Sequence, residues 1–401
     1  MTLISDCRLT AFGAVSPAGR GADALFNSLL AGQNALRPIS VFNPDGLRNA
    51  VAGEVEGYPI SDDGGLPRAY RMLRDAVSEA LAAADSGARR SLDRSKTALV
   101  LGTNFGCVSI PERVLGTPPG GASAAEPSGD LGVYPFDETA AQLGREFCLG
   151  GPRMTVSLSC ASGAAIVGVA SDLLNEPGID SVVAAGFDEL TLTNYSGLSA
   201  LRAVTPEIIR PFDAERNGTQ FSEGVGCVIM ENAVRAERRG RESTIAVLGW
   251  AANNDGYHMT APDQDGTGII AAMRAAIKDA GVEPDAIEYI NAHATGTQYN
   301  DLIETRAIKA VFGERAKSLP IAANKSVLGH GMGAAGIWEL ISTAYSMTTG
   351  KLPPTASYQT PDPDLDLDYS VGGVKEKAIK TAMSCSYGFG GTNAVVVLAV
   401  C

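Results

Sequence analysis

Short apolar runs, each ending in glycine or another small residue, recur along this sequence and alternate with helix-like segments. The runs predict buried strands and cover Thr97 to Gly102, Met154 to Ser159, Ser181 to Gly186, Ile287 to Ala292 and Asn393 to Val400. The last run is apolar without a break from Ala394, which indicates burial on both faces of a sheet. Between the runs, Ala161 to Leu174 and Gly268 to Ala280 place apolar residues on one broad helical face. The alternation predicts an α/β fold with helices on both sides of central sheets.

The composition is that of a folded chain with a large core. Apolar residues make up 45% of the 401 residues and charged residues 19%, proportions that exclude extended disorder. The length allows two to three domains or one large duplicated fold. The segment Val108 to Tyr134, rich in Pro, Gly and Ser, interrupts the rhythm and is predicted to be an excursion or lid outside the core.

Charge and cysteine content disfavour several functions. A net charge of -13 argues against binding of nucleic acid, which needs a basic surface. Seven cysteines without Cys-x-x-Cys spacing argue against both a disulfide framework and a structural zinc site. The first twenty residues lack a secretory pattern, and no apolar stretch approaches the ~18 residues of a membrane helix. We expect a soluble, cytoplasmic protein without membrane insertion.

One cysteine and one histidine occupy positions suited to chemistry. Cys160 follows an alternating run and precedes a helix of small residues, so its thiol should lie at a helix N-terminus, which lowers a thiol pKa. A buried, inert cysteine is the structural alternative. His293 follows a predicted strand, at the sheet edge where ligand crevices form in α/β proteins. The structural alternative for His293 is a histidine buried in the core with its hydrogen bonds made to neighbouring residues.

A second histidine is accompanied by a cation. Residues 324–336 carry Lys325 and His330 and run into another helix of small residues. A cation near two imidazoles disfavours their protonation and leaves neutral rings that can donate to an oxyanion. Glu339 on the following helix could balance the lysine. The glycine-rich segment 386–393 lacks the lysine of a P-loop and opens no helix, so it predicts backbone N–H groups aimed at an oxyanion.

Together these phrases resemble the condensing enzymes of the thiolase superfamily, most closely the elongating β-ketoacyl-[acyl-carrier-protein] synthases of type II. The resemblance spans essentially the whole chain. Its six ordered motifs are Ser159-Cys160-Ala161-Ser162-Gly163; Pro211-Phe212-Asp213 with Arg216, Gly218, Glu223 and Gly224; Tyr257-His258-Met259-Thr260; Asn291-Ala292-His293; Lys325 with Gly329-His330; and Gly388-Phe389-Gly390-Gly391-Thr392-Asn393. The chain departs from the family pattern at Ser159, usually Ala, at Ala294, usually Gly, and at Asn300. These departures leave open whether it serves bulk fatty-acid synthesis or a specialised polyketide-like pathway.

The resemblance implies a duplicated five-layer α/β/α/β/α fold of the thiolase type. An N-terminal half, residues 1–240, would carry the nucleophilic cysteine, and a C-terminal half, residues 241–401, both catalytic histidines. The implied activity is that of a 3-oxoacyl-[acyl-carrier-protein] synthase. The cysteine takes an acyl chain from a carrier-protein thioester, malonyl carrier protein loses carbon dioxide, and the carbanion extends the acyl chain by two carbons. No metal or organic cofactor is required, and the family is usually homodimeric, with a heterodimer left open.

The same matching assigns roles to single residues. The implied catalytic residues are Cys160, His293, His330 and Lys325. The backbone N–H groups of Cys160 and Phe389 would form an oxyanion hole, and the Phe389 ring would act as a gate. The implied supporting residues are Glu339, Asp301 and Glu304, and the implied acyl pocket contains Phe105 and Leu198. A phenyl ring at position 105 is expected to shorten that pocket, because the family often has a smaller aliphatic residue there. For docking of an acidic carrier protein, Arg202 matches a family position near the pocket entrance, and Arg68, Arg71 and Arg74 are candidates because they recur at helical spacing. A solvated basic face is the alternative for these three.

Other classes explain the motifs less well. The main alternative is a non-elongating partner subunit, which sets chain length beside an active synthase but typically lacks the cysteine that Cys160 supplies. A cysteine hydrolase needs a thiol and an imidazole, and leaves His330 with Lys325 unexplained. A degradative thiolase would carry a C-terminal Cys-x-Gly phrase, whereas Cys385 is followed by Ser-Tyr. An initiating synthase would pair its cysteine with one histidine and an asparagine, whereas the segment from Lys325 to His330 supplies a second histidine here.

Overall fold

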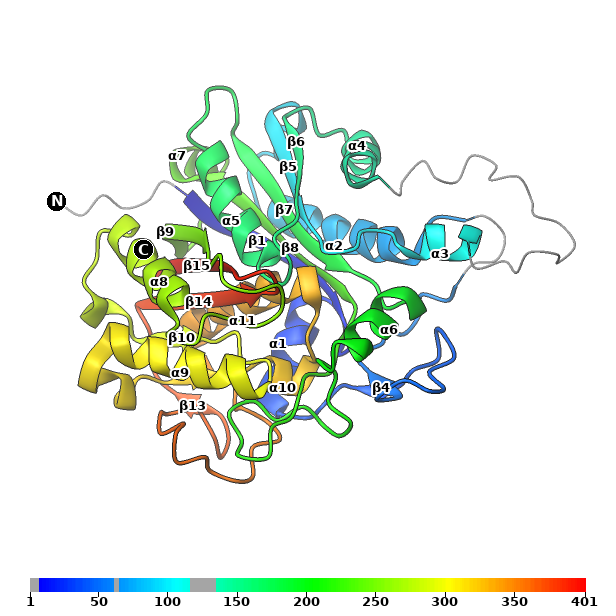
Figure 1. Ribbon diagram of the computed structural model, residues 1–401. Helices are drawn as coiled ribbons and strands as arrows, with labels where there is room; N and C mark the ends of the chain where they lie inside the picture. Colours follow the sequence, from blue (N-terminus) through cyan, green and yellow to red (C-terminus); the bar gives the residue numbers. More distant parts are fainter. Residues whose placement is uncertain (1–6, 61–64, 116–134) are drawn as a thin grey trace, which may run out of the picture.

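The central sheet consists of two half-sheets joined edge to edge. The computed structural model describes residues 7–60, 65–115 and 135–401 (Figure 1). The first half-sheet has the order β6 (Arg153–Val156), β5 (Thr97–Gly102), β7 (Ser181–Asp188), β8 (Gly224–Asn232), β1 (Cys7–Ser16). The second has the order β11 (Ile321–Ala322), β10 (Tyr289–Asn291), β14 (Thr381–Gly388), β15 (Thr392–Val400), β9 (Ile245–Asn254). Between β1 and β9 the two are joined by one residue pair, Arg8 with Ala246.

The two half-sheets repeat one topology. In each, the strands lie in the sequence order third, second, fourth, fifth, first. In each, the first three strands of that order are parallel and the last two are antiparallel. Identical order and identical pairing show that the fold is a duplication of one unit. This confirms the duplicated fold that the resemblance implied.

Helices separate and cover the half-sheets. Helix α2 (Arg68–Asp85) packs on the outer face of the first half-sheet, and α8 (Thr267–Asp279) with α9 (Gln298–Phe312) covers the second. Helices α5 (Ser162–Leu173) and α11 (Ala335–Thr349) contact each other and strands of both half-sheets, so they form the middle layer. The result is the expected five-layer α/β/α/β/α arrangement (Figure 1). The remaining helices and short strands are α1 (Ala22–Ala31), α3 (Ser109–Leu115), α4 (Phe136–Glu146), α6 (Leu192–Ala200), α7 (Ala233–Arg238), α10 (Lys325–Leu328), β2 (Gly19–Arg20), β3 (Arg37–Pro38), β4 (Val51–Ala52), β12 (Lys351–Leu352) and β13 (Lys375–Glu376).

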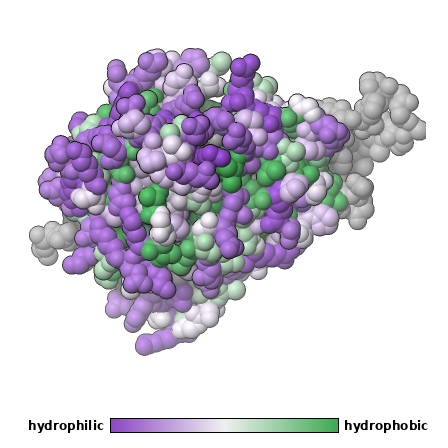
Figure 2. Space-filling model, turned by 90° about the horizontal axis from the view of Figure 1, so that it is seen from below, coloured by the Kyte–Doolittle hydropathy of each residue, from purple (hydrophilic) through white to green (hydrophobic). Residues whose placement is uncertain are grey.

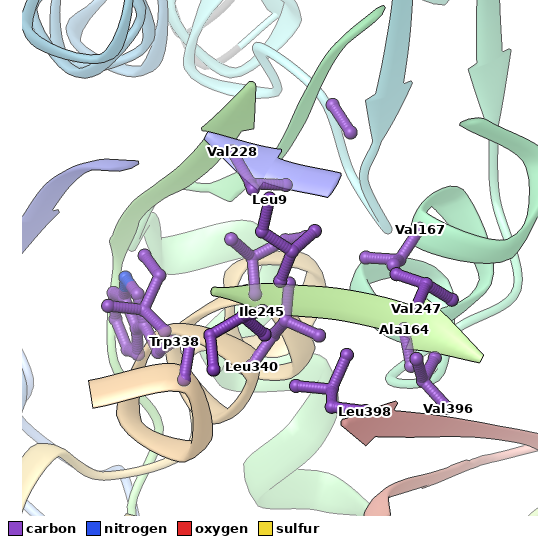
Figure 3. Close-up of a cluster of buried hydrophobic side chains, with 14 of the residues drawn as sticks. Leu9, Ala164, Val167, Val228, Ile245, Val247, Trp338, Leu340, Val396 and Leu398 are labelled. Carbon is purple, nitrogen blue, oxygen red and sulfur yellow. The ribbon is translucent and has the colours of Figure 1, made fainter. Parts of the chain in front are cut away.

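The middle layer is the core of the molecule. Val167 of α5 and Leu340 of α11 lie among strand residues such as Val228 and Leu398 (Figure 3). Apart from Leu340, which is 1% exposed, these side chains are fully buried. Each contributes about 1.5–3 kcal/mol relative to an exposed position. A helix enclosed in this way has apolar residues nearly all round, which is why α5 appears in the sequence as a broad apolar segment.

Two glycines allow the middle helices to approach closely. A Cβ added to Gly336 of α11 would lie 2.5 Å from the backbone N of Ala164 in α5, and one added to Gly163 would lie 2.9 Å from the Gly336 backbone. Neither contact can be relieved by rotating a side chain. Helix α5 begins shortly after Cys160, and α11 begins shortly after His330. The crossing of the two helices therefore fixes the distance between the segments that carry these two residues.

The crossing predicts opposite effects for two Gly→Ala substitutions. Gly336→Ala should lower the free energy of unfolding by about 1–3 kcal/mol, because the added methyl forces the helices apart. Gly197→Ala, at an exposed position of α6 where an added Cβ has no neighbour within 4 Å, should raise it by about 0.5–1 kcal/mol. Urea unfolding of the two variants measures both changes. Equal effects in the two variants would show that the helix crossing is not tightly packed.

Each of the five predicted strands is a strand of the structure; Thr97–Gly102 has the predicted ends, and the other four have shifted ends. The run Met154 to Ser159 ends as a strand at Val156, because Ser159 has a left-handed backbone with φ of 52°. The predicted excursion begins with α3, and its residues 116–134 lie outside the described part of the chain.

Polar side chains cover most of the surface seen from below the view of Figure 1, and apolar ones gather there in smaller groups (Figure 2). Across the described ranges, none of the helices has both the length and the apolar character needed to cross a membrane.

Candidate active site

Cys160 lies at a strained turn between β6 and α5. It is 7% exposed and lines a cavity of about 240 Å³. The Ser162 hydroxyl fixes the turn, because it accepts a hydrogen bond from the Leu158 N–H at 2.8 Å and donates one to the Ser159 carbonyl at 2.6 Å. The left-handed conformation of Ser159 turns the chain sharply before the thiol. The predicted strand-to-helix turn is therefore present.

The electrostatic setting of the thiol differs from the expectation of a lowered pKa. Burial raises the pKa of the Cys160 thiol above its usual value. The Ser159 hydroxyl, the charge of Lys325 and the N–H of Phe389 oppose that shift without overcoming it. Proximity to a helix N-terminus is thus outweighed by the loss of water around the sulfur.

The glycine-rich segment forms the tight turn between β14 and β15 and touches the thiol. The backbone N–H of Phe389 lies close enough to the Cys160 thiol to lower its pKa, and a Cβ added to Gly388 would lie 2.9 Å from the Cys160 backbone N. Thr392 Oγ1 donates to the Leu158 carbonyl at 2.9 Å, which holds this glycine-rich turn against the turn that carries Cys160. The two N–H groups predicted to form an oxyanion hole, those of Cys160 and Phe389, therefore lie beside the sulfur.

His293 and His330 face each other as an orthogonal pair. Their ring centroids are 5.3 Å apart and their planes meet at 87°. Lys325 Nζ lies 3.3 Å from Nδ1 of His293 and donates to the carbonyl of the same residue at 2.6 Å. The N–H of Met332 donates to Nδ1 of His330 at 3.2 Å. Since both Nδ1 atoms face donors, the hydrogen-bond network assigns the ring proton to Nε2 in each imidazole.

Both rings are held in the neutral state. Burial lowers the pKa of His293 well below its usual range, and the positive charge of Lys325 and the neighbouring His330 imidazole add to the shift. Burial lowers the pKa of His330 in the same way, again with a contribution from Lys325. The site therefore offers two neutral N–H donors and one cation, as the sequence predicted. Phe221, whose ring stacks on His330 with centroids 5.5 Å apart, and Met332, whose N–H donates to His330, both line the cavity that contains Cys160, so the thiol and the histidine pair belong to one site.

Lys325 is balanced by Glu339. The two form an ion pair in which each side chain is 2% exposed. Ser386 Oγ donates to the other Glu339 carboxylate oxygen at 3.3 Å. Burial raises the pKa of Glu339, and the ammonium group of Lys325 lowers it. The predicted partnership of Lys325 and Glu339 is thus present in the structure.

Glu304 and Asp301 hold the loop that carries His293. Glu304 accepts the N–H groups of His293 at 2.8 Å and Ala294 at 2.9 Å. Asp301 accepts the N–H groups of Gly296 at 3.2 Å and Phe212 at 2.8 Å. Ala294, which stands where the family usually has glycine, adopts a left-handed backbone with φ of 47°. The two carboxylates thus act through the backbone of the loop.

A buried carboxylate that the sequence reading missed ties the two halves of the site together. Asp188, at the end of β7, accepts from the Phe105 N–H at 2.9 Å and from Thr103 Oγ1 at 2.6 Å. Its other oxygen accepts from the Gly333 N–H at 2.7 Å, three residues after His330. Burial raises the pKa of Asp188 to about 6. The signal available in the sequence was an acidic residue at the end of a mostly apolar strand.

The predicted acyl-pocket residues lie where they were expected, whereas one of the four predicted docking arginines is buried. Phe105 and Leu198 both line the cavity that contains Cys160. For Arg68 the prediction of a docking surface is wrong, because its side chain is 6% exposed and forms a buried ion pair with Glu223. Arg71 and Arg74 are half-buried, whereas Arg202 is exposed.

The third histidine lies apart from the cavity. His258 is exposed, and its Nδ1 accepts the N–H groups of Thr260 at 3.1 Å and Ala261 at 3.2 Å, so it caps its own turn. Within residues 7–60, 65–115 and 135–401, no group of three or more His, Cys, Asp or Glu side chains is arranged to hold a metal ion.

Family comparisons agree with this geometry. Residues 6–236 match the family described as Beta-ketoacyl synthase, N-terminal domain, and residues 245–359 match its C-terminal domain. The chain belongs to the beta-ketoacyl synthase family. The resemblance drawn from the motifs is therefore confirmed.

Relatives come from both fatty-acid and polyketide synthesis. The chain is 30% identical over 409 residues to 3-oxoacyl-[acyl-carrier-protein] synthase 2 of Coxiella burnetii, with 97% of each chain covered. It is 33% identical over 414 residues to the tetracenomycin polyketide synthase ketoacyl synthase alpha subunit of Streptomyces glaucescens, covering 98% of this chain and 96% of the relative.

Solved structures superpose over nearly the whole ketosynthase chain. A type II polyketide synthase ketosynthase, in complex with its acyl-carrier protein and bound to the hexaketide, matches with a TM-score of 0.90, 28% identity and coverage of 98% and 99%. A beta-ketoacyl synthase from Burkholderia phymatum matches with a TM-score of 0.88, 28% identity and the same coverage.

Proposed function

We propose that this chain is a 3-oxoacyl-[acyl-carrier-protein] synthase, which extends an acyl chain by two carbons through decarboxylative Claisen condensation. The observation that carries the proposal is the convergence of one thiol, two neutral imidazoles and one lysine on a single buried site. The family membership and the presence of Cys160 favour an active synthase over a partner subunit.

The first step is acyl transfer to Cys160. The sulfur attacks the carbonyl carbon of a carrier-protein thioester, and the carrier thiol leaves with a proton. The tetrahedral oxyanion is stabilised by the N–H groups of Cys160 and Phe389, which lie beside the sulfur. The Phe389 ring lines the same cavity, and its flanking glycines permit it to move aside for the chain.

The second step is formation of the carbon–carbon bond. The Nε2–H groups of His293 and His330 donate to the carbonyl oxygen of the malonyl thioester. The bond to the carboxylate breaks, carbon dioxide leaves, and its electron pair is held as an enolate by these donors. The carbanion then attacks the acyl-cysteine carbonyl, the carbon–sulfur bond breaks, and Cys160 is regenerated. Neutral rings suit this role because they donate without bringing further charge beside Lys325.

The expected partners follow from the relatives and remain part of the proposal. An acyl carrier protein would deliver both thioesters, and Arg202 with the partly exposed Arg71 and Arg74 would supply the local positive charge that an acidic carrier needs. A second copy of this chain is the expected dimer partner, with a chain-length-factor subunit as the alternative. Residues 1–240 and 241–401 are proposed as the two ketosynthase halves, and the cytoplasm as the location.

The proposal predicts a separation of the two chemical steps. The purified chain should convert acyl and malonyl carrier proteins to a 3-oxoacyl product, whereas Cys160→Ala should form none and still release carbon dioxide from malonyl carrier protein. His330→Ala should lower that release at least about 100-fold, the effect of removing one oxyanion donor. Product chromatography and carbon dioxide release measure the two steps. Product that forms only after a second subunit is added, and that Cys160→Ala leaves unchanged, would favour the partner-subunit alternative.

A further inference from the structure

Two consecutive backbone N–H groups after His330 have different acceptors. The N–H of Met332 donates to Nδ1 of His330 at 3.2 Å, and the N–H of Gly333 donates to Oδ2 of Asp188 at 2.7 Å. The φ and ψ angles of Met332 set the angle between these two N–H groups, because the peptide bonds on either side are planar. The Asp188 carboxylate therefore helps to fix the direction of the N–H that reaches His330.

The backbone of Met332 is held in a strained conformation. Its φ of 53° is left-handed, in a region that residues with a Cβ rarely adopt. Such a conformation persists only where the surrounding contacts determine it. Before Met332, the His330 N–H donates to the Gln220 carbonyl at 2.7 Å, and after it the Gly333 N–H is held by Asp188. The strained residue is thus fixed on both sides, and Asp188 is the contact that follows it.

The carboxylate of Asp188 is itself fixed by a segment in the wall of the catalytic cavity. Its Oδ1 accepts from Thr103 Oγ1 at 2.6 Å and from the Phe105 N–H at 2.9 Å. Gly333 fits closely against the other oxygen, since a Cβ added to it would lie 2.8 Å from Oδ2. The carboxylate is therefore in place as a rigid acceptor for the Gly333 N–H.

The charge of Asp188 is unfavourable both for folding and for acylation. Its four hydrogen-bond donors are all neutral, and in the described part of the chain no cationic side chain pairs with it. A buried charge without a cation lowers stability. Burial is the main cause of the raised pKa of Cys160, and the charge of Asp188 adds to it, so the carboxylate opposes formation of the thiolate. A charge with these two drawbacks indicates a role in the other half-reaction.

We propose that Asp188 is a positioning residue for decarboxylation, which keeps the Met332 N–H directed at Nδ1 of His330. The inference rests on the proposed function, since His330 acts there on the malonyl thioester. The N–H of Met332 keeps the ring proton on Nε2, the donor that the decarboxylation uses. Without the carboxylate the strained turn relaxes, Nδ1 loses its donor, and the ring adopts the other tautomer in part of the molecules.

Replacing Asp188 with asparagine changes its charge and its acceptors at nearly constant size. The amide has one acceptor oxygen, which the donors of Thr103 and Phe105 hold on their side. Its NH2 group then faces the Gly333 N–H, from which it cannot accept. The substitution therefore removes the contact that follows Met332 while keeping the cavity wall in place.

Asp188→Asn should have opposite effects on the two half-reactions. In the Cys160→Ala background it should lower carbon dioxide release from malonyl carrier protein at least about tenfold, the effect of losing one hydrogen bond to a charged group. With Cys160 present, it should speed acylation by hexanoyl-pantetheine at pH 7 at least about threefold, because a negative charge near the thiol is gone. Timed intact-protein mass spectrometry measures the acylation. Damage to the site as a whole would lower both rates.

Glu189→Gln is the matched control, at the next position of the chain. Glu189 is fully buried, as Asp188 is, and accepts the backbone N–H groups of Ala69 at 3.1 Å and Ser109 at 2.8 Å. Neither of these groups belongs to the segment after His330. Both half-reactions of this variant should stay within about twofold of their values in the parent chains.

Asp188→Ala is the second variant, in case the asparagine variant does not fold. It removes the charge and both acceptor oxygens, so it should show the same pair of opposite changes. Unchanged carbon dioxide release, an equal fall in both half-reactions, or failure of both variants to fold would overturn this inference and leave the proposed function standing. No carbon dioxide release by Cys160→Ala, together with no acylation of wild type, would overturn both.

Discussion

Replacing Lys325 with methionine should lower the free energy of unfolding by about 3–5 kcal/mol, the cost of leaving one member of a buried ion pair alone. The partner left behind is Glu339, whose side chain is 2% exposed. The same change removes the donor from Nδ1 and the carbonyl oxygen of His293. The ring then loses the contacts that fix its tautomer, and decarboxylation of malonyl carrier protein should fall at least about 100-fold.

A double variant separates the two effects. Lys325→Met with Glu339→Gln removes both charges while nearly conserving volume, so much of the lost stability should return. Activity should not return, because His293 still lacks its cation. Guanidinium unfolding and carbon dioxide release measure the two quantities on the same samples. A stable and fully active double variant would show that Lys325 serves only the fold.

The two half-reactions should respond differently to pH. Burial raises the pKa of Cys160, so the reactive thiolate is a minor species at neutral pH and its fraction grows about tenfold per pH unit below the pKa. Acylation of wild type should therefore rise with a slope near one between about pH 6.5 and 8.5. The pKa values of His293 and His330 lie well below their usual range, so both rings stay neutral throughout that interval.

Decarboxylation by the Cys160→Ala variant isolates the histidines from the thiol. Its rate should change by less than about threefold over the same pH interval, because neither ring changes charge. Stopped-flow measurement of carbon dioxide release and timed mass spectrometry of the acyl-enzyme give the two profiles. A steep fall in decarboxylation between pH 7.5 and 6.5 would mean that an imidazole titrates there and would contradict the assigned neutral state.

The sequence predicted β5, β6 and β7 of the first half-sheet and β10 and β15 of the second, and missed the two strands at the seam, β1 and β9, together with β8, β11 and β14. Strand β7 appears as an apolar run, whereas β8 begins Gly224-Val225-Gly226, a pattern typical of turns. The structure explains the glycines, since a Cβ added to Gly226 would lie 2.5 Å from Ile337 of α11. The need for such glycines depends on a helix more than a hundred residues away, so local pattern cannot reveal it.

The part of the site that could be predicted from the sequence is the set of residues whose own side chains carry the chemistry. Cys160, His293, His330 and Lys325 stand in short phrases whose residue types suggest their chemistry, and the structure brings them together. The thiol pKa and the position of Arg68 were mispredicted, because both depend on burial, which the spacing of residues along a helix does not report. Asp188 was missed for a related reason, as its four hydrogen-bond partners come from segments distant in sequence.

The most direct test of the central claim is whether Cys160 carries the acyl chain. Wild type and Cys160→Ala are each mixed with a medium-chain acyl carrier protein, examined by intact-protein mass spectrometry, and then treated with malonyl carrier protein. We expect an acyl adduct on wild type alone, which malonyl carrier protein discharges as a 3-oxoacyl product. An adduct of equal yield on the alanine variant, or no adduct on wild type with any primer length, would contradict this claim.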